Sequence, residues 1–270
     1  MIELFEQDIK TIDRQSSKGN QLKWRNESYW YKADYTGYEG IVEYIVSKLI
    51  TKSTLHNNEI TNYEIEEIQY KRRIWLGCKS INFLPEGWQL ITLERLFHNY
   101  YGHSLQQAIY KINGDKERLE FLVNQTIRIT GLTEFGQYMN KLLTIDAIFL
   151  NEDRHTHNIA VLLDSNGEYQ YCPIFDNGAS LLSDIKLDYP LDESFYNLIE
   201  TVKAKTFSAN FDDQLDASEE LYGKNLRFHF TKKDVSNLLK KEQLYSEEVK
   251  KRIEDVLFYQ MDKYQYLFSR

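Results

Sequence analysis

Polar and hydrophobic residues alternate through much of the first third of the chain, a pattern typical of strands with one buried face. The run Asn26-Glu27-Ser28 separates two such segments and has the composition of a turn, so we expect those two segments to form a hairpin. The turn-forming residues Pro85 and Gly87 follow the last of these segments. The expected strands are 11–14, 21–25, 29–33, 63–70 and 73–83.

Helical spacing begins at residue 39, because apolar side chains recur at three- and four-residue steps from Ile41 to Ile50. Beyond Leu90 this spacing dominates, which predicts that the later part of the chain is mainly helical. One strand pair interrupts the helices, and Asn166-Gly167 favours a tight turn between its strands. The expected helices are 39–55, 105–112, 116–129, 134–150 and further ones from about 194, and the expected strand pair is 159–163 with 169–174.

The change of pattern near Pro85 is the one plausible domain boundary, and no internal repeat is visible in the sequence. We therefore predict an α+β fold with two lobes. A small β-rich N-lobe with one helix is expected at residues 1–84, and a larger, mainly helical C-lobe at residues 85–270. A cleft between two such lobes is the expected place for a ligand.

The composition of the 270 residues, 42% hydrophobic and 27% charged, excludes a disordered or low-complexity protein. A net charge of −8 opposes nonspecific attraction to nucleic acid or to an anionic membrane. Two cysteines are too few for a disulfide scaffold. No apolar run reaches the roughly 18 residues that a membrane span needs. The first ten residues are acidic and do not have the pattern of a secretory signal. These features predict a cytoplasmic protein that contacts neither membrane nor nucleic acid directly.

The most informative segment is the polar loop at residues 151–158, between an apolar helix and the strand pair. Asp153 and Asn158 stand five residues apart, the spacing with which protein kinases place a catalytic base and a metal-binding amide. After the strand pair comes Asp176, with Gly178 two residues later, like the metal-binding carboxylate of kinases. Each residue alone is also typical of a turn or a helix cap, but their order along the chain indicates phosphoryl transfer.

The reaction itself explains why these residue types are needed. A hydroxyl attacks a triphosphate only when the negative charge of the phosphates is offset, and Mg²⁺ prefers oxygen ligands. Asn158 and Asp176 supply such oxygens, so we expect them to hold Mg²⁺ together with ATP. Asp153 is then left to accept the proton of the incoming hydroxyl.

Lys32 lies in an otherwise apolar strand, where a charged residue needs a partner. We expect an ion pair with the following helix: Glu43 is preferred, and Glu39 is the alternative, because a carboxylate in the first turn also complements the helix dipole. Arg154 either holds a phosphate on a loop or pairs with a buried carboxylate. The His-x-His pair that begins at His155 is a weak zinc pattern, which favours a structural or nucleotide-contacting role.

Two runs, LLTIDAIFLNEDRHTHNIAVL and YCPIFDNGAS, resemble the catalytic core of the HipA-like serine/threonine kinases of bacterial toxin-antitoxin systems. The runs KADYTGYEGIVEYIVSKL and KAKTFSANFDDQ resemble further segments of that family, and the resemblance covers residues 16–214. It implies a two-lobed protein-kinase-like fold that uses ATP and Mg²⁺. It implies that Asp153 is the catalytic base, that Asn158 and Asp176 are Mg²⁺ ligands, and that Lys32 is the phosphate-binding lysine. It also implies nucleotide contacts for His155, Phe175 and, in a hinge at residues 78–83, Ser80.

The phosphate-covering loop that the resemblance implies lies at residues 16–20 and contains a single glycine, Gly19. Ser17 and Gly19 are assigned to the nucleotide site, and the additional N-terminal subdomain of the longer toxins is not expected here. By the same resemblance, Ser16 or Ser17 is a candidate autophosphorylation site, where an added phosphate would repel ATP, but we prefer to interpret both serines as ordinary turn residues.

These observations predict an ATP- and Mg²⁺-dependent serine/threonine protein kinase of the HipA-like toxin type. The implied partners are a protein substrate of the translation machinery and a helix-turn-helix antitoxin. Two alternatives remain open. A DRHxxN loop also resembles that of phosphatidylinositol kinases, which favours a lipid or small-molecule acceptor, and the glycine-poor loop is compatible with a nucleotide-binding pseudokinase.

Overall fold

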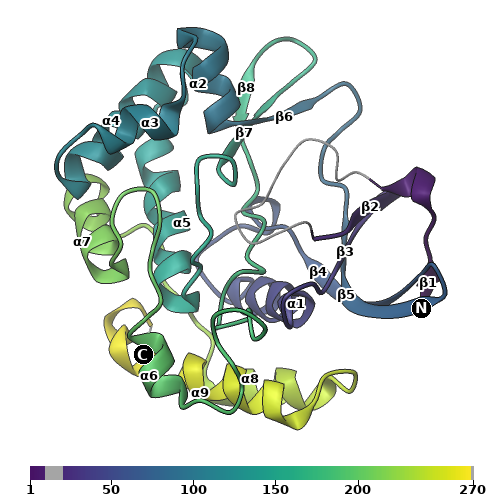
Figure 1. Ribbon diagram of the computed structural model, residues 1–270. Coiled ribbons are helices and arrows are strands. Elements are labelled where there is room, and N and C mark those ends of the chain that lie inside the picture. The colour runs from purple at the N-terminus through teal and green to yellow at the C-terminus, as the bar shows by residue number, and fades with distance from the viewer. Residues whose placement is uncertain (10–20, 269–270) are drawn as a thin grey trace. The chain divides into compact units, whose positions relative to one another are not determined.

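The computed structural model describes residues 1–9 and 21–268. The fold is of the α+β class, with most of the strands in the N-terminal part and most of the helices after it, as expected (Figure 1). The described chain forms two compact units. Unit 1 comprises Met1–Phe83, Asp176–Val202 and Phe228–Arg270, and unit 2 comprises Leu84–Phe175 and Lys203–Arg227.

Unit 1 contains a five-stranded sheet in the order β1-β4-β5-β3-β2. The pair β1 and β4 is parallel, and the other neighbours are antiparallel. A core cluster that includes the buried residues Trp24, Tyr31 and Ile68 packs against the sheet. The strands are β1 (Ile2–Glu3), β2 (Lys23–Asn26), β3 (Tyr29–Ala33), β4 (Tyr63–Tyr70) and β5 (Arg73–Ile81).

Helix α1 (Glu39–Ile50) lies against β3, β4 and β5 in unit 1 (Figure 1). Its apolar side chains from Ile41 to Ile50 are buried, as the spacing predicts. The helix is shorter than the expected 39–55, because the hydroxyls of Thr51 and Ser53 donate hydrogen bonds to carbonyls of its last turn. The remaining helices of unit 1 are α6 (Phe195–Ile199), α8 (Lys232–Lys241) and α9 (Glu247–Lys263), with 3-10 turns η1 (Glu6–Asp8), η2 (Asn57–Glu59) and η3 (Gln265–Leu267).

Unit 2 is mainly helical, and its central helix is buried on nearly all sides. In α5 (Phe135–Phe149), thirteen residues are buried, and α4 and α7 both pack against it. A helix that is apolar on every face is typical of a domain core. The other helices are α2 (Leu93–Tyr101), α3 (Leu105–Tyr110), α4 (Asp115–Thr130) and α7 (Phe211–Tyr222).

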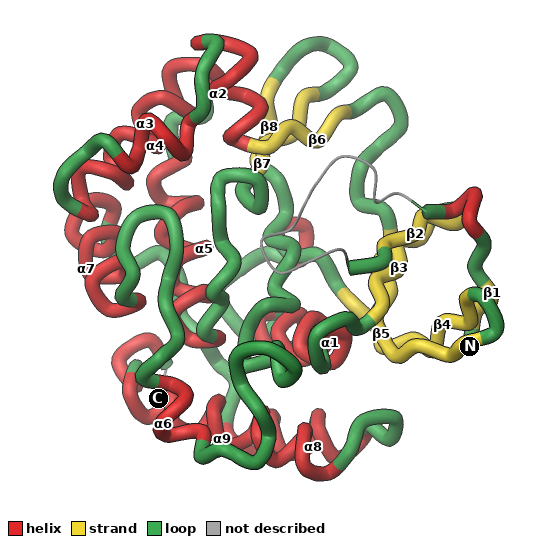
Figure 2. Tube along the Cα trace, in the orientation of Figure 1, coloured by secondary structure: helices red, strands yellow, loops and turns green. Residues whose placement is uncertain are grey.

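A three-stranded antiparallel sheet in the order β6-β7-β8 accompanies these helices. It consists of β6 (Gln89–Thr92), β7 (Ala160–Leu163) and β8 (Tyr169–Tyr171). The hairpin of β7 and β8 was expected, but β8 ends before residue 174, because Pro173 has no N–H to continue the ladder. Figure 2 shows the segments on either side of this hairpin as loops, and these loops carry half of the predicted site residues.

The strand expected at 11–14 lies outside the described residues. The predicted division into lobes at residues 84 and 85 stays a prediction, because the compact units divide the chain in four places rather than one. Of the helices in the described part of the chain, none combines the length and the apolar character that crossing a bilayer requires.

Candidate active site

In unit 1, Lys32 on β3 lies between two carboxylates. Its Nζ is 2.5 Å from Oε1 of Glu43 on α1 and 2.7 Å from Oδ1 of Asp176. Lys32 stands opposite Cys78 of the central strand β5, so the lysine is placed where the sheet meets the helix. A second cation, Lys23, stands opposite Lys32 on β2 and has its Nζ 3.9 Å from Oδ2 of Asp176. The Asp176 carboxylate therefore faces two lysines.

The partner of Lys32 on α1 is Glu43 and not Glu39. The Glu39 carboxylate instead accepts hydrogen bonds from the backbone N–H groups of Tyr35, Thr36 and Gly37, which closes the turn before the helix. Glu43 is buried, with 1% of its side chain exposed, and its Oε2 accepts a hydrogen bond from the backbone N–H of Asn177. Glu43 thus connects Lys32 to the segment that carries Asp176.

The charge of Lys32 is fixed by these two acids. Burial disfavours the ammonium ion, but the charges of Asp176 and Glu43 outweigh burial and raise the pKa of Lys32 well above its ordinary value. Tyr63 on β4 adds a cation–π contact, with the Lys32 Nζ 5.1 Å from the ring centroid. Lys32 therefore stays positively charged in the folded protein.

Asp176 adopts an unusual backbone conformation. Its φ of 61° lies in the left-handed region, which residues other than glycine occupy infrequently and at an energetic cost. The following Asn177 and Gly178 stay close to α1, since a Cβ on Gly178 would lie 3.4 Å from side-chain atoms of Glu39 and Glu43. The left-handed turn brings the Asp176 carboxylate to Lys32 while the chain continues along the helix.

In unit 2, the loop at 151–158 is organised around Arg154, which is fully buried. The guanidinium donates to both carboxylate oxygens of Asp146 on α5, with the Nη2 atom 3.0 Å from Oδ1. Nη1 donates to the backbone carbonyls of Asn158 and Phe175. Of the two predicted roles, the described partners of Arg154 thus match the one with a buried carboxylate. Burial raises the pKa of Asp146, although the Arg154 charge opposes the increase.

Asp153 and Asn158 lie together in this loop. The Asn158 Nδ2 donates to the backbone carbonyl of Asp153 at 2.9 Å, and this bond commits the nitrogen of the amide and leaves its oxygen as the atom suited to a metal ion. The Asp153 Oδ1 is 2.9 Å from Nζ of Lys205, and its Oδ2 is 3.7 Å from Nε2 of His155. Lys205 therefore holds Oδ1 of the Asp153 carboxylate, and His155 lies near Oδ2.

Lys205 is the site residue that the sequence reasoning did not identify. It lies 52 residues after Asp153, and no spacing rule connects the two positions. Its neighbour Thr206 anchors this part of the chain to the loop, because the Thr206 hydroxyl donates a hydrogen bond to the Arg154 carbonyl at 2.9 Å. The Thr206 backbone has a φ of 81°, in the left-handed region. The only signal in the sequence is that Lys205 belongs to the run KAKTFSANFDDQ, which contributed to the family resemblance.

The other predicted residues are placed as follows. Ser80 is buried within β5, paired with Trp30 and Tyr63 on the neighbouring strands. Phe175 contributes its carbonyl to the Arg154 network and is followed directly in the chain by Asp176. Ser17 and Gly19, like the candidate phosphorylation site at Ser16, lie outside the described residues.

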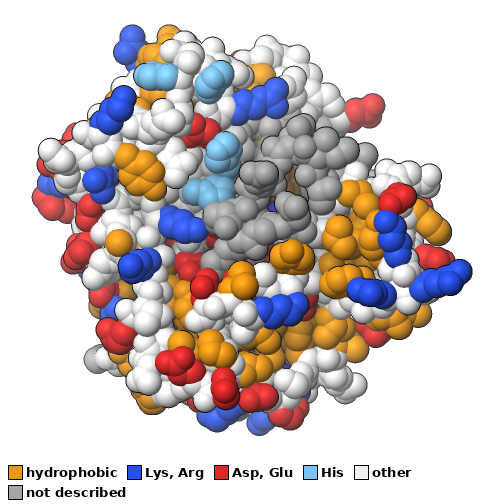
Figure 3. All heavy atoms as spheres, in the orientation of Figure 1, with side chains coloured by type: hydrophobic (Ala, Val, Ile, Leu, Met, Phe, Trp, Pro, Cys, Tyr) orange, Lys and Arg blue, Asp and Glu red, His pale blue; other side chains and the backbone are white. Residues whose placement is uncertain are grey.

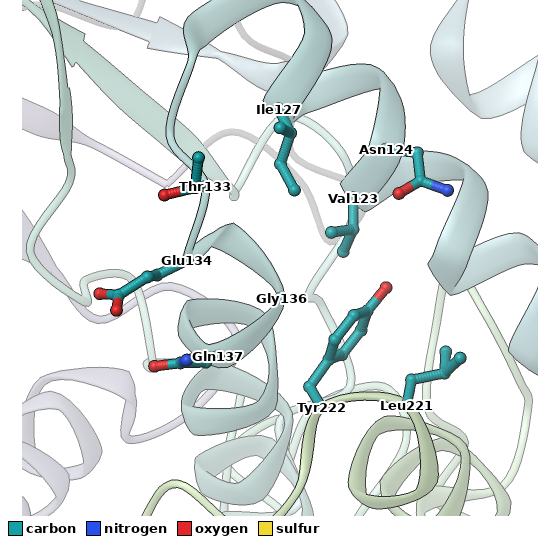
Figure 4. Close-up of a pocket in the computed structure, with 9 residues that line it drawn as sticks. All are labelled: Val123, Asn124, Ile127, Thr133, Glu134, Gly136, Gln137, Leu221 and Tyr222. Carbon is teal, nitrogen blue, oxygen red and sulfur yellow. The ribbon is translucent and has the colours of Figure 1, made fainter.

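A cavity of about 310 Å³ lies elsewhere, between α4, α5 and α7 of unit 2 (Figure 4). Tyr222 lines it, and a Cβ added to Gly136 would meet the ring of that tyrosine at 2.3 Å. Its described lining residues include none of the predicted site residues. This cavity is therefore separate from the candidate site.

The described residues of each unit offer oxygen ligands of the kind that a nucleotide-bound Mg²⁺ uses, and no protein-only metal site. Within the two described stretches of the chain, no group of three His, Cys, Asp or Glu side chains is arranged to hold a metal ion. Mg²⁺ in phosphoryl-transfer enzymes needs only one or two carboxylate or amide oxygens, because phosphate oxygens and waters complete its coordination. Asp176 and Asn158 supply hard oxygen ligands of that kind.

Comparison with known proteins assigns the fold to the kinase class. One matching solved structure is that of a proinflammatory kinase of Helicobacter pylori, CtkA, with a TM-score of 0.61 and 17% sequence identity. The match covers 97% of this chain and 94% of that one. No family model matches the chain, and no curated protein matches it by sequence. The expected kinase-like fold is thus confirmed.

Proposed function

We propose that the protein is an ATP- and Mg²⁺-dependent serine/threonine protein kinase. The observation that supports this most strongly is the pair of ion pairs at Lys32, which joins β3 to Glu43 of α1 and to Asp176. In protein kinases a lysine and a glutamate paired in this way orient the nucleotide phosphates, and a nearby carboxylate binds the metal. A lysine held only for stability would not need two acidic partners, one of them the buried Glu43.

In this proposal, Lys32 binds phosphate oxygens and Glu43 holds the ammonium group in position. Asp176 and the amide oxygen of Asn158 would hold Mg²⁺, which, when bound, offsets the charge of the triphosphate. The acceptor hydroxyl oxygen forms a bond to the γ-phosphorus, and the bond from that phosphorus to the leaving oxygen of ADP breaks. Asp153 accepts the proton of the hydroxyl, and Lys205 orients the Asp153 carboxylate.

We also propose the HipA-like toxin type, with a protein of the translation machinery as substrate and a helix-turn-helix antitoxin as partner. The support is the resemblance of the loop, hairpin and acid at residues 151–176 to that family. Expression in bacteria should then arrest growth, and Asp176→Ala should relieve the arrest. A wild-type protein without effect on growth would contradict the toxin type and leave the kinase activity to be judged separately.

The lipid-kinase alternative requires a surface that attracts anionic membranes. On the face in Figure 3, the described Lys and Arg side chains are interspersed with Asp and Glu side chains and form no continuous basic patch. The net charge of −8 points the same way. We therefore favour a protein hydroxyl as the acceptor, and labelled lipid without labelled protein in a transfer assay would reverse this choice.

Thermal unfolding tests the nucleotide site. A ligand that binds only the folded protein stabilises it, by about 2.7 kcal/mol when its concentration is 100 times Kd. We expect ATP with Mg²⁺ to raise the melting temperature, and ATP with EDTA or Mg²⁺ alone to have little effect. An unchanged melting temperature in ATP with Mg²⁺ would contradict the proposed site. Stabilisation without any phosphoryl transfer would indicate the pseudokinase.

A further inference from the structure

Asp34 makes a second set of contacts beside the candidate site. It follows β3 directly, two residues after Lys32, within unit 1. Its Oδ1 accepts a hydrogen bond from the backbone N–H of Gly40 at 2.6 Å, and its Oδ2 accepts one from the Tyr245 hydroxyl at 2.7 Å. One carboxylate therefore connects the end of β3, the first turn of α1 and the loop between α8 and α9.

The first turn of α1 has little room to move. A Cβ on Gly40 would lie 2.6 Å from backbone atoms of Gly77 on β5, so the helix begins in close contact with the central strand. The Asp34 bond to Gly40 holds the helix at this point. Glu43 lies one turn further along, so its position depends on how this first turn is held.

Tyr245 is itself fixed by its own loop. The Glu242 carboxylate accepts hydrogen bonds from the backbone N–H groups of Leu244 and Tyr245, at 2.6 and 2.9 Å. Lys250 on α9 donates to the Glu242 carbonyl at 3.2 Å. The Tyr245 ring is buried, with 7% of the residue exposed. The hydroxyl that reaches Asp34 is therefore presented by a rigid loop and not by a freely rotating side chain.

These contacts form a continuous series. Tyr245 holds Asp34, Asp34 holds the first turn of α1, and α1 presents Glu43 to Lys32 and to the N–H of Asn177. We infer that Asp34 and Tyr245 are positioning residues, through which the loop between α8 and α9 sets the position of α1 and thereby the Lys32–Glu43 ion pair. This inference rests on the proposed kinase function for its effect on turnover.

Tyr245→Phe tests the inference, because it removes one hydroxyl and retains the buried ring. We expect kcat to fall on the order of tenfold, with the KM for ATP changing less, since the residue acts through Glu43 and not on nucleotide directly. The same change at the exposed Tyr100 is the matched control and should leave both constants unchanged. If Tyr245→Phe melts below the assay temperature, Asp34→Ala replaces it, because it removes both acceptor oxygens, and a similar fall in kcat is expected.

A double-variant cycle separates positioning from general stability. If Tyr245 acts through Glu43, the Tyr245→Phe change should lower kcat much less in a Glu43→Gln background than in the wild type. Full additivity of the two effects would overturn the inference.

A readout without turnover keeps the inference separate from the proposed function. The NMR signal of the Lys32 ammonium in protein with ¹⁵N-labelled lysine should shift in Tyr245→Phe toward its position in Glu43→Gln, and should not move in Tyr100→Phe. An unmoved Lys32 signal in Tyr245→Phe overturns the inference, whether or not the protein transfers phosphate. A protein that shows the shift but no transfer would contradict the proposed kinase function alone.

Discussion

At the scale of single residues, the central feature is a lysine with two acidic partners. Lys32 has 12% of its side chain exposed, and Glu43 has 1%. Opposite charges removed from water stabilise a protein only while they remain paired, because an unpaired buried charge is costly. The position of Lys32 in an apolar strand predicts an ion pair with the following helix, because a charge there needs a partner, and Glu43 was the preferred partner. The sequence could not predict that Asp176 would complete the group, because that contact spans 144 residues.

Removing the lysine should therefore destabilise the fold. We expect Lys32→Met to lower the free energy of unfolding by about 3 kcal/mol, because Glu43 then lacks its ammonium partner. Urea unfolding measures the change. Lys48→Met is the matched control: the Lys48 pair with Glu64 is exposed, and its loss should cost less than about 1 kcal/mol. Equal losses in the two variants would contradict this account of Lys32.

Asp34 predicts a specific pH dependence of stability. Burial and the charge of Glu39 raise its pKa to about 7, although Tyr245, the Gly40 N–H and Lys186 oppose the increase. The unfolded carboxyl titrates near 3.9, so between about pH 4 and pH 7 the folded state keeps a proton that the unfolded state has lost. The contribution of Asp34 to the free energy of unfolding therefore has its full value below about pH 4. It decreases as the pH rises from 4 and is lost once the pH passes through 7.

Asp34→Asn should remove this dependence, so the variant should gain stability relative to the wild type as the pH rises from 5 to 8. Urea unfolding at both pH values measures the difference. Asp234→Asn is the control, because the partly exposed Asp234 hydrogen-bonds with Lys52 and has its pKa lowered to about 2, which places its titration below this window. A wild-type-like pH dependence in Asp34→Asn would show that the carboxyl does not titrate there.

At the scale of elements, the candidate residues lie on a strand, on a helix and on loops, and close contacts hold these elements in place. The 151–158 loop is fixed to α5 by the Arg154–Asp146 pair, and α1 is fixed to β5 by the contact at Gly40. The long periodic elements were predictable: β3 and β4 have the expected bounds, and α4 and α5 differ by one residue at each end. Short elements such as β1 and β6 were not, because their two and four residues carry too little periodicity and depend on distant partners.

The buried pair between α5 and the loop gives a prediction at this scale. Asp146→Ala leaves the Arg154 guanidinium buried without its carboxylate and should destabilise the protein by about 3–5 kcal/mol. Thermal unfolding followed by circular dichroism measures the loss. Asp115→Ala is the control, because its pair with Arg118 is partly exposed and should contribute less than about 1 kcal/mol. A loss at Asp146 no larger than at Asp115 would contradict the structural role of this pair.

At the scale of the whole molecule, a kinase-like fold occurs with only 17% sequence identity to a solved kinase. Such a fold depends on the pattern of buried positions and on a few chemically required residues, so most other positions are free to vary. The predicted residues that the structure describes extend from Lys32 to Asp176, and the structure adds Lys205. The 151–158 loop, the β7–β8 hairpin and Asp176 were recognisable because they follow one another closely in the sequence. Lys205, in contrast, comes near Asp153 only when unit 2 folds.

The most direct test of the proposed function is transfer of the radiolabelled γ-phosphate from ATP to protein serine or threonine. The wild type should transfer label, and Asp153→Asn should reduce the rate at least about 100-fold, the usual effect of losing a catalytic base, while stabilisation by ATP with Mg²⁺ is retained. Asp164→Asn, in the β7–β8 turn, should behave like the wild type. Transfer at the wild-type rate by Asp153→Asn, or no transfer by the wild type, would contradict the proposed mechanism.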